Sequence, residues 1–242
     1  MINDFGINRT MIKIIALITM TIDHIGLMLF PNYHIFRIIG RIAMPLFCYM
    51  IAEGAYHTHN RKKYLLSIFV IGFICFLVYL LFLKQFYFNI LISFSFSLIL
   101  IYSYDNITES CKIKNKKSFI LYLLLFITIF IISCFLGFCD KITGNSSIYM
   151  DYSIFPVFIP FLVYLGFKNK WIRFLLFFLG VLALYCYYEF VEHSPNHQMY
   201  SLISVLIIFF YSGKKGKFDF KSFFYLYYPL HLVVLYLIRL FI

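Results

Sequence analysis

The chain has 242 residues, of which 63% are hydrophobic and only 13% are charged, and its formal net charge at pH 7 is +11. Soluble domains carry roughly 25% charged residues, so the composition excludes a soluble globular protein and indicates a polytopic membrane protein. The basic residues stand in short clusters between apolar runs, as topology determinants do, and we therefore expect no nucleic-acid partner. The six cysteines show neither metal-ligand nor disulfide spacing, so no metal is expected.

Apolar runs separated by loop residues predict about nine membrane-spanning helices. They cover residues 12–30, 35–56, 65–83, 86–104, 118–139, 152–167, 171–188, 198–212 and 222–241. Spans of about twenty residues occupy most of the chain, which leaves no room for a soluble domain. We therefore expect one all-α integral-membrane domain over residues 1–242, with any chemistry confined to the membrane and its two mouths.

The distribution of Lys and Arg predicts the orientation of these spans. A cytoplasmic N-terminus places most of the 21 basic residues on the cytoplasmic side, as the positive-inside rule requires. The predicted cytoplasmic loops then include the basic clusters at 61–63, 112–117, 168–173 and 214–221. With nine spans, the C-terminus lies outside.

The first span carries Asp23 and His24 in the middle of an otherwise apolar segment. Ionisable groups at that depth are expensive unless they face a partner or a polar cavity, so they indicate a functional site. Hydrogen bonding that only holds helices together remains the alternative. Counting helix rise from the cytoplasmic end places these residues at about 17 and 18 Å, and places His231 of the last span at about 14 Å. The three groups should therefore share one level.

Arg37 and Arg41 lie one helical turn apart in the second predicted span. Two guanidinium groups on one face suit an anionic ligand or an intramembrane carboxylate such as Asp23. Arg41 is the candidate to pair with Asp23. The alternative is that these arginines extend toward the outer headgroups.

Two predicted cytoplasmic segments combine basic residues with features of a phosphate site. In the first, a helix end carrying a carboxylate and an imidazole at i and i+4 leads into three consecutive cations; in the second, glycines permit the backbone to curve around an anion. The candidate ligands are Glu53, His57, Arg61, Lys62, Lys63, Lys214 and Lys215. From the pattern alone, a purely topological role of the cations is favoured.

Several segments along the chain resemble the TraX family. They are Lys13–Gly26, Arg37–Phe47, Glu53–Arg61, Asn89–Leu98, Asp151–Ser153, Tyr211–Gly216 and Phe224–Leu232. The Asp-His pair in the first and the Tyr-Pro-Leu-His-Leu run in the last are specific signatures. Ser153 departs from the glycine of the family's DYG segment, and Ser212 departs from the asparagine of its YNGKRG-like segment.

The resemblance implies an integral-membrane acetyltransferase of the bacterial inner membrane. The family's named member acetylates the N-terminus of a conjugative pilin, and the family resembles the wider transmembrane acyltransferases that include heparan-alpha-glucosaminide N-acetyltransferase. The implied donor is cytoplasmic acetyl-CoA, and the implied acceptor is an amine of a peptide, a protein or a small molecule. Which amine it is, and whether the protein forms a homodimer among the membrane lipids, stays open.

For such a reaction His24 is the candidate base or acyl carrier, because an imidazole has a suitable pKa near neutrality. Asp23 would orient or charge-stabilise the site, and His231 is the second candidate from the facing span. Arg41 or Tyr228 could stabilise the oxyanion. The alternative function is a proton-coupled carrier or flippase that uses Asp23, His24 and His231 as a relay. Binding of acetyl-CoA would separate the two.

Overall fold

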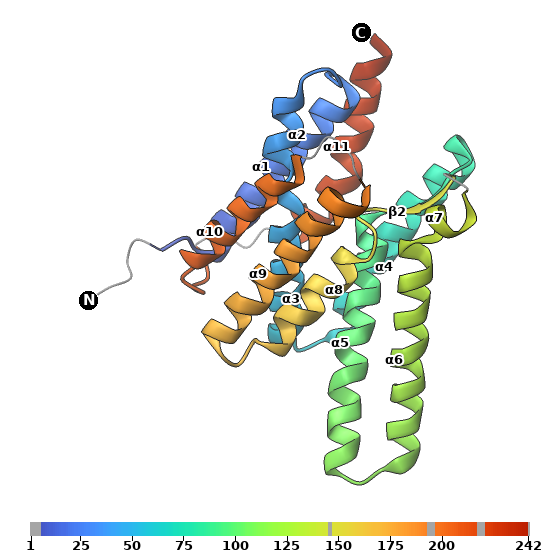
Figure 1. Cartoon of the computed structure of the whole chain (residues 1–242), viewed down its shortest axis with the longest axis vertical. Helices are drawn as coiled ribbons and strands as arrows, with labels where there is room; N and C mark the ends of the chain where they lie inside the picture. The colour runs from blue at the N-terminus through green and yellow to red at the C-terminus, as the bar shows by residue number, and fades with distance from the viewer. Residues whose placement is uncertain (1–5, 145–146, 193–196, 217–220, 242) are drawn as a thin grey trace. The chain divides into compact units, whose positions relative to one another are not determined.

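The computed structural model describes residues 6–144, 147–192, 197–216 and 221–241 (Figure 1). These residues are mostly helical, which confirms the all-α expectation with a small exception. The exception is a parallel pair of three-residue strands, β1 (Phe86–Phe88) and β2 (Ile148–Met150), in which Tyr87 is opposite Tyr149.

Six of the described helical segments are long and apolar enough to cross a membrane. They are Arg9–Met28, His34–His57, Arg61–Phe82, Ile90–Lys112, Lys116–Gly137 and Lys170–Glu192. The other three predicted spans coincide with the shorter apolar helices Phe155–Leu165, His197–Phe209 and Leu226–Phe241. The length and composition of these helices indicate a membrane protein. The total of nine spans and the cytoplasmic N-terminus stay predictions.

The described chain divides into two compact units, which are described separately. The first unit comprises residues 1–50 and 168–242. It contains α1 (Arg9–Met28), α2 (His34–Gly40), the first half of α3 (Ala43–His57), α9 (Lys170–Tyr187), the π-helical turn η2 (Tyr188–Glu192), the 3-10 helix η3 (His197–Leu202), α10 (Ile203–Phe209) and α11 (Lys221–Phe241). Whether these two units act as the single integral-membrane domain expected over residues 1–242 is not tested by this division, so the single domain stays a prediction.

Two glycines allow α1 and α2 to pack closely as a helical hairpin. A Cβ atom on Gly26 would overlap the side chain of Phe36, and one on Gly40 would overlap the carboxyl group of Asp23. Helix α1 begins after Asn8, whose side chain accepts a hydrogen bond from the Met11 N–H at 3.0 Å. The hairpin thereby brings the polar centre of α1 against α2.

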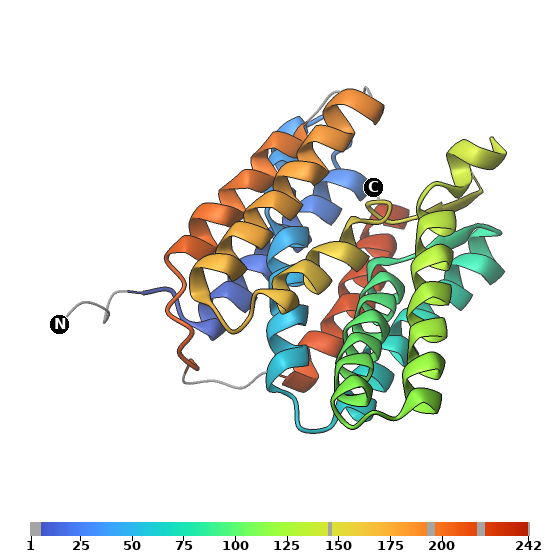
Figure 2. The same ribbon diagram turned by 60° about the horizontal axis from the view of Figure 1, so that its bottom comes forward.

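The second unit covers residues 51–167. It contains the second half of α3, α4 (Arg61–Val78), the π-helical turn η1 (Tyr79–Leu83), β1, α5 (Ile90–Lys112), α6 (Lys116–Gly137), the short α7 (Cys139–Thr143), β2 and α8 (Phe155–Leu165). Figures 1 and 2 show α5 and α6 side by side as an antiparallel pair joined by a short turn. Leu100, Met150 and Val157 form a buried core beside them.

The boundaries of α5 correct the predicted fourth span at 86–104. Residues 86–88 form β1, and the helix begins after Asn89, whose side chain accepts from the Leu91 N–H at 3.1 Å. The helix also continues to Lys112, beyond the end of the apolar run. Consequently Asp105, which was predicted to lie outside the span, is part of α5.

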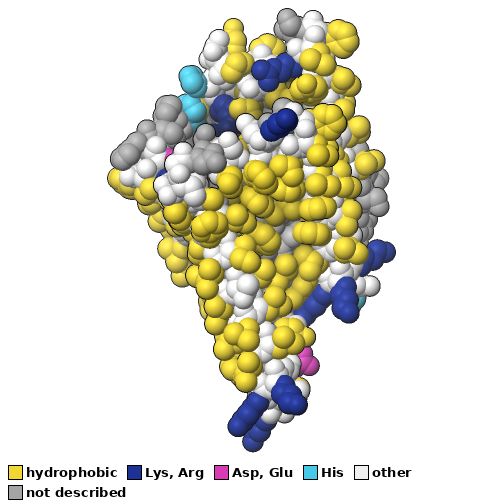
Figure 3. All heavy atoms as spheres, turned by 90° about the vertical axis from the view of Figure 1, so that its right-hand side faces the viewer, with side chains coloured by type: hydrophobic (Ala, Val, Ile, Leu, Met, Phe, Trp, Pro, Cys, Tyr) yellow, Lys and Arg dark blue, Asp and Glu magenta, His cyan; other side chains and the backbone are white. Residues whose placement is uncertain are grey.

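The surface of α6 is that of a lipid-facing helix. Leu121 is 63% exposed and Ile131 is 59% exposed, and other apolar side chains along α6 are exposed as well. Figure 3 shows hydrophobic side chains over most of one face, with one group of Lys and Arg at the lower tip, where α5 turns into α6, and others in the upper part and at the right-hand edge. An apolar surface bounded by cations is the pattern expected of a helix pair in a bilayer.

Candidate functional site

The polar centre of the first unit is a contact between two histidines, His24 of α1 and His231 of α11. His231 Nε2 lies 2.9 Å from His24 Nδ1, and the ring centroids are 4.9 Å apart. His231 is buried, with 6% of its surface exposed, and His24 is half-buried. The two residues are 207 positions apart in the sequence. Helix counting predicted that the two histidines lie at one level, and their contact confirms this. Their catalytic role stays a prediction.

The hydrogen bonds of this pair determine which nitrogen atoms carry protons when both rings are neutral. His231 Nδ1 lies 2.8 Å from the main-chain oxygen of Tyr227. A carbonyl oxygen only accepts, so His231 Nδ1 carries a proton and its Nε2 has a free electron pair. His24 Nδ1 must then donate to that pair, which leaves His24 Nε2 unprotonated. The arrangement therefore leaves His24 Nε2 unprotonated, with a free electron pair.

Two tyrosines of α11 surround His231. The ring of Tyr227 stacks on the imidazole with an interplanar angle of 9° and a centroid distance of 5.2 Å. The ring of Tyr228 meets the imidazole edge to face at 5.8 Å. Tyr228, a predicted site residue, thus lies beside His231 and is itself buried. Tyr227 was not predicted.

Asp23 pairs with Arg37, which corrects the expected partner. Arg37 Nη1 donates to Asp23 Oδ2 at 2.7 Å, and 10% of the Asp23 side chain is exposed. The charge of Arg41 also acts on this carboxylate, but the guanidinium that donates the hydrogen bond belongs to Arg37. Arg37 therefore does not simply extend to the outer headgroups. Arg41 follows the last residue of α2, where the helix is interrupted before α3 begins at Ala43.

The opposite oxygen of Asp23 is deeply buried. Asp23 Oδ1 has no hydrogen-bond partner among the described residues and lies where Gly40 lacks a side chain. Burying an ionised carboxylate is costly unless a cation accompanies it. The Arg37 guanidinium supplies that cation, so Asp23 and Arg37 form one buried unit beside His24.

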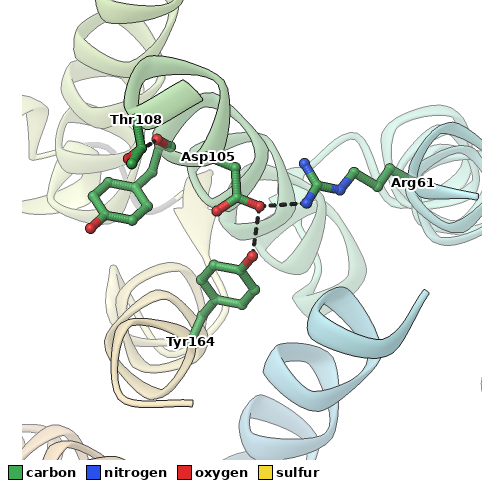
Figure 4. A network of polar contacts seen from close by, with 5 residues as sticks. Arg61, Asp105, Thr108 and Tyr164 are labelled. Atoms are coloured by element: carbon green, nitrogen blue, oxygen red, sulfur yellow. Dashed lines mark hydrogen bonds and ion pairs between the residues drawn. The ribbon is translucent and has the colours of Figure 1, made fainter. Parts of the chain in front are cut away.

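The first predicted basic segment belongs to the second unit, where Arg61 is part of a polar network (Figure 4). Arg61 Nη2 lies 2.6 Å from Asp105 Oδ2, and the same oxygen accepts a hydrogen bond from the Tyr164 hydroxyl at 2.6 Å. The guanidinium also lies over the Tyr102 ring, 5.2 Å from its centroid. The network ties together α4, α5 and α8. Sequence reasoning missed Asp105 because the apolar run ends before it.

The neighbours of Arg61 differ in exposure. Lys62 and Lys63 are exposed, as a binding surface for phosphate would require. Glu53 is buried, with 5% of its surface exposed, whereas His57 is exposed and its ring contacts Phe167 at 5.6 Å between centroids. Glu53 and His57 both lie in α3, which confirms their predicted placement one helical turn apart on one helix.

The second basic segment belongs to the first unit and is paired with the start of the chain. Ile7 and Tyr211 form a parallel bridge, and the Arg9 N–H donates to the Lys214 carbonyl at 3.0 Å. A Cβ atom on Gly216 would overlap Thr10, so this glycine permits a close approach. The side chains of Lys214 and Lys215 are exposed. Lys217, which belongs to the predicted basic loop, lies outside the described residues.

Comparisons with known proteins identify a family and two relatives of this chain. The family model described as "TraX protein" matches residues 8–239. "Probable fimbrial assembly protein FimC, serogroup H1" of Dichelobacter nodosus is 26% identical over 251 residues, which cover 93% of this chain and 92% of the relative. "Uncharacterized protein RP591" of Rickettsia prowazekii (strain Madrid E) is 42% identical over 99 residues, which cover 40% of this chain and 38% of the relative. No solved structure matches. The family match spans nearly the whole sequence, and the chain therefore belongs to the TraX family.

Proposed function

We propose that this protein is an integral-membrane acetyltransferase that moves an acetyl group from cytoplasmic acetyl-CoA to an amine at a peptide or protein N-terminus. The observation that carries the proposal is the His24–His231 contact, whose hydrogen bonds leave His24 Nε2 unprotonated. Membership of the TraX family supports the reaction, since the resemblance implies pilin acetylation. A relative named as a fimbrial assembly protein supports a pilus-type protein as the acceptor.

The chemistry at His24 follows from the tautomers. As a base, His24 Nε2 takes a proton from the amine while the amine nitrogen attacks the thioester carbonyl. The C–N bond forms, the C–S bond breaks, and the proton on Nε2 passes to the leaving thiolate, so that coenzyme A departs as the thiol. Between these two proton transfers the positive charge can move from His24 to His231, because the Nδ1 proton of His24 can pass to His231 Nε2, 2.9 Å away. As an acyl carrier, Nε2 instead attacks the thioester and passes the acetyl group to the amine. Both routes begin at the same nitrogen.

The remaining predicted residues have supporting roles in this proposal. Arg41 and Tyr228 are candidates to stabilise the oxyanion of the attacked carbonyl. The exposed Lys62 and Lys63 are candidates for the phosphates of coenzyme A. Lys214 and Lys215, which belong to the first unit, are a separate candidate phosphate site. Of the first basic segment, Arg61 already binds Asp105, so its contribution to donor binding is shared with a structural one.

Transfer of labelled acetyl from acetyl-CoA to a peptide amine, by purified protein in lipid nanodiscs, tests the proposal. Replacing His24 with Ala should lower the rate by roughly 10² to 10⁴, the usual contribution of a positioned base. His59→Ala is the matched control, because this histidine is exposed in the second unit and should leave the rate unchanged. A folded His24→Ala protein with the normal rate would remove His24 from the mechanism. Wild-type protein that neither binds nor uses acetyl-CoA would point to the carrier alternative.

A further inference from the structure

A second polar contact joins α1 to α11 close to the histidine pair. The hydroxyl groups of Thr21 and Tyr227 lie 2.8 Å apart. Thr21 precedes His24 by three residues, and Tyr227 precedes His231 by four, so each pair shares one face of its helix. The two contacts therefore form neighbouring rungs between the same two helices.

Tyr227 contacts His231 at both its main chain and its side chain. Its carbonyl oxygen accepts the hydrogen bond from His231 Nδ1 at 2.8 Å. Its ring stacks on the imidazole at an interplanar angle of 9°. One residue thereby sets the protonated nitrogen of His231 and restricts rotation of the ring. The hydroxyl group at the far end of the same side chain is the atom held by Thr21.

The direction of the hydroxyl contact follows from the number of protons available. Thr21 Oγ1 donates its hydrogen to the Leu17 main-chain oxygen at 2.8 Å. A threonine hydroxyl has one proton and two acceptor positions, so Tyr227 is the donor to Thr21 Oγ1. Because this contact occupies the phenolic proton of Tyr227, the phenol is poorly placed to act as the acid or base itself.

We propose that Thr21 and Tyr227 are positioning residues for the histidine pair. Their hydrogen bond fixes the register and rotation of α11 against α1, so that His231 Nε2 meets His24 Nδ1 and His24 presents Nε2 to the reactants. The proposal rests on the proposed acetyl transfer for its catalytic consequence. Its structural consequence, a maintained hydrogen bond between the two rings, is independent of any activity.

Nuclear magnetic resonance of protein with ¹⁵N-labelled histidine tests the structural part directly. Wild-type protein should show a coupling across the hydrogen bond between His24 Nδ1 and His231 Nε2. Tyr227→Phe keeps the stacked ring and the carbonyl and removes only the hydroxyl, and Thr21→Val removes the partner at nearly constant volume. Both variants should weaken or lose the coupling. An unchanged coupling in the two folded variants would overturn the proposal.

Acetyl-transfer kinetics test the catalytic part. Each single variant should lower kcat by roughly threefold to tenfold, the scale of one hydrogen bond, and leave the KM for acetyl-CoA unchanged. The double variant should be no slower than either single one, because both remove the same contact. Additive losses, or a change confined to KM, would contradict a shared positioning role.

Two control substitutions match the chemistry of the test variants. Tyr236→Phe removes a hydroxyl from an exposed tyrosine of α11. Thr108→Val removes a threonine that, like Thr21, donates to the carbonyl one turn earlier but lies exposed on α5 (Figure 4). Both should retain the ring-to-ring coupling and the rate. Loss of the coupling in these controls would overturn the proposal, because the effect would not be specific to the Thr21–Tyr227 contact. If wild-type protein has the coupling and transfers no acetyl group, the proposed function fails and the positioning inference stands.

Discussion

Replacing Arg37 with Gln should destabilise the protein by removing the only cation hydrogen-bonded to Asp23 among the described contacts. The ionic atoms are 2.7 Å apart, and 10% of the Asp23 side chain and 23% of the Arg37 side chain are exposed. Removing one partner of a buried ion pair costs about 3–5 kcal/mol, because the other charge stays buried. The partial exposure of Arg37 lets water relieve some of this, so we expect the lower end, about 3 kcal/mol.

A double-mutant cycle with Asp23→Asn separates the pair from the other effects of each substitution. The double variant removes both members of the ion pair and leaves neither of them as a buried charge without its partner, so its loss should be smaller than the sum of the single losses by about 2 kcal/mol. The assay is reversible unfolding in mixed micelles, followed by tryptophan fluorescence or circular dichroism. Purely additive losses would refute the conclusion that Asp23 and Arg37 act as one buried unit.

The Arg61–Asp105 pair supplies an internal control for this magnitude. It joins the same residue types at 2.6 Å, but 45% of the Arg61 side chain and 23% of the Asp105 side chain are exposed. Exposed ion pairs contribute about 0–1 kcal/mol, so its cycle should give a clearly smaller coupling. Equal couplings for the two pairs would mean that burial does not determine the difference.

Three further substitutions test other features. Gly40→Ala should destabilise by about 1–3 kcal/mol in the same assay, because a Cβ atom there overlaps the Asp23 carboxyl group; an unchanged midpoint would contradict the close approach. Ser153 has a left-handed backbone with φ of 55°, a conformation that glycine adopts more readily than alanine. The Ser153→Ala variant should therefore be less stable than the Ser153→Gly variant by about 1 kcal/mol, and the reverse order would refute the left-handed conformation at this position. Replacing Lys62 and Lys63 with Gln should weaken acetyl-CoA binding measured by calorimetry, as should added salt; unchanged affinity would leave these lysines with only a topological role.

The sequence was sufficient to predict the all-α fold class and the common level of the two histidines. Helix rise is fixed by the backbone, so counting residues from the ends of two apolar runs placed His24 and His231 at one depth. Counting could not identify Arg37 as the partner of Asp23. That choice depends on how closely α1 and α2 approach, and the approach is set by Gly40, whose importance appears only when the two helices are in contact.

The errors at the ends of α5 have a similar origin. The apolar residues Phe86–Phe88 fit a helix or a strand equally well, and only their pairing with β2 selects the strand. At the other end, Asp105 interrupts the apolar run without ending the helix, because Arg61 and Tyr164 satisfy its carboxylate. Partners from distant parts of the sequence determined both outcomes.

The histidine pair unites residues from the two ends of the chain, with the whole second unit inserted between them. During synthesis, α1 enters the membrane long before α11 has been translated, so His24 is inserted before its partner His231 has been made. Until then the neighbouring α2, with Arg37, is the element that can shield the carboxylate. The ion pair with Arg37 would thus shield Asp23 in the assembly intermediate. Chains that stop before residue 231 would lack the contact between His24 and His231.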